Sequence, residues 1–135
     1  RLVPRGGRVA DKMVLNVDVA PTILDLAGVS IPDDMHGVSW RPILERKRTR
    51  WRKAFLYEYY EYPAVHMVAK NRGVRTRRWK YIHYFEEPEA FELYDLKNDP
   101  EEVNNLYGDP KYEGKVDELR RLLTRLRQET HDPDL

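Results

Sequence analysis

The strongest constraint on the fold is an amphipathic helix predicted over residues 114–130. Its apolar residues recur at intervals of three and four positions, which places them on one helical face. They are Val116, Leu119, Leu122, Leu123 and Leu126. A helix with one apolar face must bury that face against another element. This helix therefore predicts that the preceding residues supply a surface for it, and a sheet is the obvious one.

The residues before the helix are rich in aromatic side chains and are expected to form short strands. The expected strands are residues 54–61, 67–69, 74–76, 79–85 and 91–96. Strand 79–85 alternates between two faces, with Trp79, Tyr81 and His83 on one of them. The basic pair Arg77-Arg78 is expected to form the turn of a hairpin. The fold class that follows is α+β, a small antiparallel β-sheet packed by a long C-terminal helix.

Short helices are expected in three other places. The first runs from Asp18, as its N-cap, to Gly28, whose residue type suits a left-handed C-terminal cap. The second begins after Ser39, and the third begins with Asp99-Pro100-Glu101-Glu102, where Pro at the first helical position follows an Asp N-cap. The first fifty residues are thus expected to hold the first two of these helices, and the rest to contain the sheet.

A basic run marks the change between these two parts. Six of the eight residues from 46 to 53 are Arg or Lys. We place the boundary between two structural units there, giving residues 1–50 and 51–135. The run is interpreted as a solvated linker, with contact to a sulfated polysaccharide or to nucleic acid as the alternatives.

The composition excludes several chemistries for this chain. It contains no cysteine, so a disulfide framework, a thiolate nucleophile and a Cys-based metal site are all excluded. Asp33-Asp34 is expected to be an exposed turn, and the four histidines lack the spacing of metal ligands. The net charge of +1 gives no case for nucleic acid or an anionic membrane as partner of the whole chain. No catalytic residue and no metal ligand is therefore assigned.

A carbohydrate-binding wall is the one binding site that the residues suggest. Aromatic faces with a few polar groups are typical of sites that orient a sugar. The aromatic strand contributes Glu58, the following loop contributes His66, and the next strand contributes Arg75. These three are the candidate substrate-binding residues. The alternative is that the tyrosines pack under the C-terminal helix and that His66 is exposed.

Several motifs, in this order, resemble the C-terminal end of a type I, formylglycine-dependent sulfatase of the alkaline phosphatase superfamily. The first is the Asp-x-x-Pro-Thr-x-x-Asp-x-x-Gly pattern from Asp18 to Gly28, followed by His36-Gly37-Val38-Ser39. Later matches are Trp79-Lys80-Tyr81-Ile82 and Glu92-Leu93-Tyr94-Asp95-Leu96 with Asp99-Pro100. The stretch from Trp51 to Glu58 is most similar to N-acetylglucosamine-6-sulfatases and mucin-desulfating sulfatases.

The resemblance implies that the complete protein hydrolyses a sulfate ester of a sugar, using formylglycine and calcium, in a periplasmic, secreted or lysosomal setting. The Cys/Ser-x-Pro-x-Arg motif of that family is not in this chain, and its calcium ligands come from earlier segments. Residues 1–50 would then be the last helices of an α/β sulfatase core, and residues 51–135 a subdomain that supports the substrate cleft. The implied partner is a sulfated carbohydrate, not nucleic acid or a membrane. The alternatives are an independent polyanion-binding module and a fragment of a related phosphatase-type hydrolase.

Overall fold

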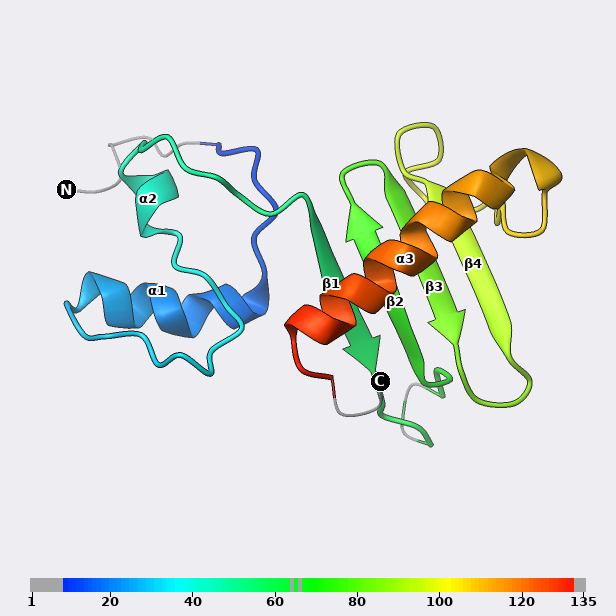
Figure 1. The fold of residues 1–135 in the computed structure, drawn as a ribbon, viewed down its shortest axis with the longest axis horizontal. Coiled ribbons are helices and arrows are strands. Elements are labelled where there is room, and N and C mark those ends of the chain that lie inside the picture. The colour runs from blue at the N-terminus through cyan, green and yellow to red at the C-terminus, as the bar shows by residue number, and fades with distance from the viewer. Residues whose placement is uncertain (1–8, 64, 66, 133–135) are drawn as a thin grey trace. The chain divides into compact units, whose positions relative to one another are not determined.

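The structure is a computed structural model, which describes residues 9–63, 65 and 67–132. It divides into two compact units, Arg1–Arg52 and Lys53–Leu135, which are drawn in Figure 1. None of the helices that the structure describes is long and apolar enough to cross a membrane.

The second unit is a four-stranded antiparallel sheet covered on one face by a helix. The strands are β1 (Ala54–Tyr59), β2 (Asn71–Thr76), β3 (Trp79–Tyr84) and β4 (Ala90–Asp95), and their order in the sheet is the order in the chain. Figure 1 shows α3 (Glu113–Glu129) running across the sheet. The predicted small sheet and long C-terminal helix are therefore confirmed.

The core of this unit lies between α3 and one face of the sheet. Val74, Tyr81 and Leu93 face one another across β2, β3 and β4, and all three are fully buried. The buried residues Val116, Leu119 and Leu123 of α3 pack on them, with Leu122 and Leu126 at the margin. The apolar stripe of the helix is thus the surface that the sequence predicted to be buried.

Two segments differ from the expectation. Residues 67–69 form no strand. Strand β2 instead runs from Asn71, and it pairs with β1 along its whole length, with Asn71 opposite Tyr59. Residues 99–102 form a turn instead of a helix, since Glu102 adopts a left-handed backbone with φ of 57°. This turn brings Leu106 back to the edge of β4, where its N–H donates to the Leu93 carbonyl. Tertiary pairing overrides local helix chemistry there.

The first unit contains a 3-10 turn η1 (Asn16–Asp18) and the helices α1 (Val19–Leu26) and α2 (Arg41–Leu44). Gly28 follows α1 with φ of 73°, as its left-handed role predicts. Asp18 does not cap the helix with its side chain. Its carboxylate instead accepts hydrogen bonds from the N–H groups of Leu15 and Val38, the second of which lies twenty residues downstream.

The two N-terminal motifs are joined into one structural element. Thr22 accepts a hydrogen bond from the Trp40 N–H at 2.9 Å, and Ser39 donates one to Asp25 at 2.6 Å. Gly37 passes so close to η1 that a Cβ atom there would lie 1.9 Å from the Val17 carbonyl oxygen. The Gly-x-Ser turn therefore needs glycine for close approach and serine for its bond to α1.

Candidate functional site

Glu58 lies near the end of β1, just before the chain enters the loop of residues 60–70. It is exposed and accepts a hydrogen bond from the Tyr60 hydroxyl at 2.9 Å. Because side chains alternate along a strand, Glu58 shares a face with Leu56, which packs on the core beneath α3. It therefore stands at the rim of the helix-covered face, beside the loop.

Arg75 lies elsewhere on the sheet. It is exposed and pairs with Phe55 near the β2–β3 turn. Its neighbour Val74 points to α3, so Arg75 points to the opposite face. The structure therefore places Glu58 and Arg75 on opposite faces and toward opposite ends of the sheet, and one sugar ring on this unit cannot contact both.

His66, the third candidate, lies outside the described residues. The loop around it is nevertheless informative, because its apolar side chains face solvent. Val65 is 93% exposed and Met67 is 65% exposed. Glu58 lies two residues before this loop in the chain, whereas Arg75 lies five residues after it.

Two tyrosines of β1 do not pack under α3, contrary to the alternative expectation. Tyr57 and Tyr59 lie on the face away from the helix, since they alternate with Leu56. The Tyr57 ring lies over Gly73, where a Cβ atom would come within 2.4 Å of its hydroxyl oxygen. Burial raises the pKa of Tyr57 strongly, so this phenol stays neutral. Its hydroxyl has no hydrogen-bond partner among the described residues.

The basic run is not simply a solvated linker. Arg52 makes a two-pronged ion pair with Asp18, at 2.5 and 2.7 Å, and its side chain is only 16% exposed. The Asp18 side chain is completely buried. Burial by itself would raise the pKa of Asp18, but the Arg52 guanidinium and the Val38 and Leu15 N–H groups outweigh it and lower the pKa to about 2. No local pattern in the sequence indicates this pair, whose members are 34 residues apart.

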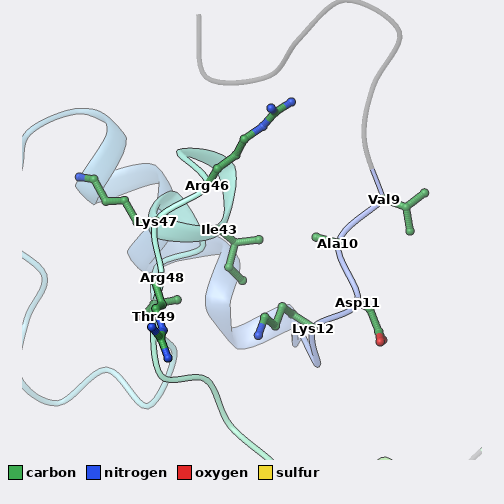
Figure 2. Close-up of a pocket in the computed structure, with 9 residues that line it drawn as sticks. All are labelled: Val9, Ala10, Asp11, Lys12, Ile43, Arg46, Lys47, Arg48 and Thr49. Atoms are coloured by element: carbon green, nitrogen blue, oxygen red, sulfur yellow. The ribbon is translucent and has the colours of Figure 1, made fainter.

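Residues 46–49 of the run line a shallow hollow in the first unit. Figure 2 shows segments 9–12 and 46–49 around it, with Ile43 between them. The lining includes four basic residues and Asp11, and it contains no aromatic side chain. A sugar site ordinarily uses aromatic faces, so this hollow is not the candidate carbohydrate site.

A calcium ion does not fit the described part of this chain. A hard divalent cation needs several oxygen ligands that converge on a point. Among the described residues no three or more His, Asp or Glu side chains are grouped in that way. No metal-dependent step is therefore assigned to these residues.

Comparison with known proteins gives consistent matches along nearly the whole chain. A family model described as "N-sulphoglucosamine sulphohydrolase, C-terminal" matches residues 3–129. An N-acetylglucosamine-6-O-sulfatase of Bacteroides thetaiotaomicron is 43% identical over 135 residues, covering 96% of this chain and 24% of the relative. A delta 4,5-hexuronate-2-O-sulfatase of the same organism is 36% identical over 107 residues, covering 79% of this chain and 22% of the relative.

A solved structure agrees with the sequence matches. The structure of BT4656 in complex with its substrate D-glucosamine-2-N,6-O-disulfate matches with a TM-score of 0.82 and 45% identity, over 88% of this chain and 25% of that chain. The chain thus spans about a quarter of the length of these relatives. These matches do not favour an independent polyanion-binding module. The chain belongs to the N-sulphoglucosamine sulphohydrolase C-terminal family and corresponds to the C-terminal part of a sulfatase.

Proposed function

We propose that the complete protein containing this chain hydrolyses a sulfate ester of a glucosamine-type sugar, with N-acetylglucosamine 6-sulfate as the first candidate. The observation that carries the proposal is the 43% identity to an N-acetylglucosamine-6-O-sulfatase across 96% of the chain. The match to a structure that holds a disulfated glucosamine supports the same class of substrate. The reaction adds water to the ester and yields the free sugar hydroxyl and inorganic sulfate.

The second unit is proposed to form one wall of the substrate cleft. Its contribution centres on the loop of residues 60–70, whose exposed apolar side chains suit contact with a sugar ring. Glu58 and His66 are proposed to bind sugar hydroxyls from this end of the sheet. Arg75 is kept as a candidate for a sulfate or carboxylate group of a longer substrate, because it lies on the other face.

The first unit is proposed to be the last segment of the α/β sulfatase core. Its helix α1 leaves apolar side chains in solvent: Ile23 is 61% exposed, and Val19 and Leu26 are each more than two-fifths exposed. Such a helix face is expected to be buried in the complete protein. The core would also supply the formylglycine nucleophile and calcium site, and the protein would work in a periplasmic, secreted or lysosomal compartment.

The test is an assay of the complete protein on defined sulfated sugars. Release of sulfate from N-acetylglucosamine 6-sulfate, measured by ion chromatography with mass spectrometry of the sugar, is the expected result. Glucose 6-sulfate tests the need for the amino sugar, and an unsaturated 2-O-sulfated hexuronate tests the other relative's substrate. Activity on the hexuronate alone would refute the substrate assignment. Activity on a phosphate or phosphonate ester with none on sulfate would refute the reaction class.

Substitutions of Glu58 and Arg75 then test the proposed wall of the substrate cleft. Glu58→Gln is expected to raise KM for the sugar several-fold and leave kcat nearly unchanged, because it removes a binding contact. Arg75→Gln is expected to have no effect on a monosaccharide, since Arg75 lies on the other face of the sheet. Equal effects of the two substitutions would contradict this arrangement.

A further inference from the structure

The connection between β1 and β2, residues 60–70, is the longest between neighbouring strands of the sheet. In Figure 1 it leaves the sheet where β1 ends and β2 begins. A loop of this length with solvent-exposed apolar side chains does not hold its own shape by burying a core. Among the loop residues that the structure describes, the contacts best suited to place the loop are those made at its two stems.

Both stems are held by two consecutive residues that follow β3. On the first stem, the Tyr60 ring packs on Phe85 with centroids 5.9 Å apart. On the second stem, Lys70 Nζ forms an ion pair with Glu86 Oε1 at 2.8 Å. Contacts on both stems from a single short segment fix the separation and direction of the loop ends.

Arg72 connects Phe85 to the end of α3. It is a buried arginine, and its guanidinium lies over the Phe85 ring at 4.2 Å. It also approaches Asp132 at 3.9 Å, and Asp132 in turn pairs with Arg127 near the end of the helix. The Phe85 ring is thus held by a cation–π contact to a buried side chain of β2, which lies outside the loop.

We propose that Phe85 and Glu86 are positioning residues that set the placement of loop 60–70 and thereby the selectivity for the sugar. Neither is proposed to touch the substrate. The inference rests on the proposed function, since it takes this loop as the sugar-facing wall. A displacement of about 1 Å in a positioning element can cost on the order of 100-fold in rate, so small losses at the stems are measurable.

The test compares a sugar substrate with a small aryl sulfate in the complete protein. Phe85→Leu and Glu86→Gln are expected to lower kcat/KM for N-acetylglucosamine 6-sulfate about tenfold, with most of the change in KM. The same variants are expected to keep the wild-type kcat/KM for 4-nitrophenyl sulfate, because it lacks the sugar ring that the loop is proposed to contact. Glu87→Gln, an exposed acid beside Glu86, is the matched control and should change neither.

A charge exchange makes the test specific to the stem contact. Lys70→Glu alone should lower sugar selectivity, and Lys70→Glu with Glu86→Lys should restore it, because the pair is re-formed with reversed charges. Parallel losses on both substrates would show a purely structural role and overturn the proposal. Failure of the double variant to recover while each single variant is impaired would overturn the part assigned to the Lys70–Glu86 pair.

A second readout separates this inference from the proposed function. Amide hydrogen exchange of residues 61–69, measured on the chain itself, should speed up in Phe85→Leu and Glu86→Gln while exchange in α3 stays unchanged. If the wild-type protein cleaves aryl sulfate but no sulfated sugar, the proposed function fails, and the exchange result alone then decides whether these residues hold the loop. Unchanged exchange in both variants would overturn the inference whatever the substrate.

Discussion

The buried pair between Asp18 and Arg52 gives the sharpest prediction about stability. Asp18→Asn removes the charge but keeps the shape, and it leaves the Arg52 guanidinium without its carboxylate in a site that is only 16% exposed. Breaking a buried pair in this way typically costs about 3–5 kcal/mol. A unit of 52 residues is expected to have a total stability of roughly 3–8 kcal/mol. The substitution should therefore leave the first unit marginal or unfolded at pH 7.

The pH dependence follows from the lowered pKa of Asp18. Its pKa falls from 3.8 to about 2, which corresponds to about 2 kcal/mol of stability. Because the folded-state pKa is the lower one, this stability is fully present above pH 4 and is lost as the pH falls toward 2. The Asp18→Asn variant should lack this component of the acid-induced loss.

Urea unfolding followed by tryptophan fluorescence measures the free energy, and amide exchange of Val38 identifies the unit that opens, since its N–H donates to Asp18. Asp33→Asn makes the same charge change at an exposed position of the same unit. It should change the free energy of unfolding by less than about 0.5 kcal/mol. Adding Arg52→Met to Asp18→Asn should recover part of the loss, because no unpaired charge remains. A wild-type unfolding midpoint for Asp18→Asn at pH 7 would refute the reasoning. So would a loss of stability at acid pH that is the same in this variant as in the wild type.

The remaining predictions concern close packing in each unit. Gly37→Ala should prevent the turn after α1 from closing, because its Cβ would overlap the Val17 carbonyl, and loss of exchange protection at Val38 is the measurement. Gly73→Ala should displace the Tyr57 ring and destabilise the second unit by about 1–3 kcal/mol in urea unfolding. Tyr57→Phe, which keeps the ring over Gly73, is the comparison and should leave the stability unchanged. Leu119→Ala should cost about 2–5 kcal/mol, since Leu119 is fully buried under the sheet, and an effect below 1 kcal/mol would contradict the assigned core.

Local sequence patterns determined most of the second unit. The spacing of Val116, Leu119 and Leu123 determines which face of α3 is buried, because helical periodicity depends only on the chain itself. Alternation in residues 79–85 likewise determines which side chains of β3 face the core. Where local helix preference and strand pairing disagreed, strand pairing determined the structure. Asp99-Pro100 is typical of a helix start, but the chain turns there and returns to the edge of β4.

Tertiary structure alone decided which polar residues meet. The candidates Glu58 and Arg75 lie on neighbouring strands, yet the register pairs Glu58 with Arg72 and so puts Arg75 three positions away, on the opposite face. Asp18 looked like a helix cap and Arg52 like part of a solvated run, but the fold buries them together. Sequence fixes the intrinsic preference of each segment, whereas contacts between residues 34 positions apart depend on how the chain closes in space.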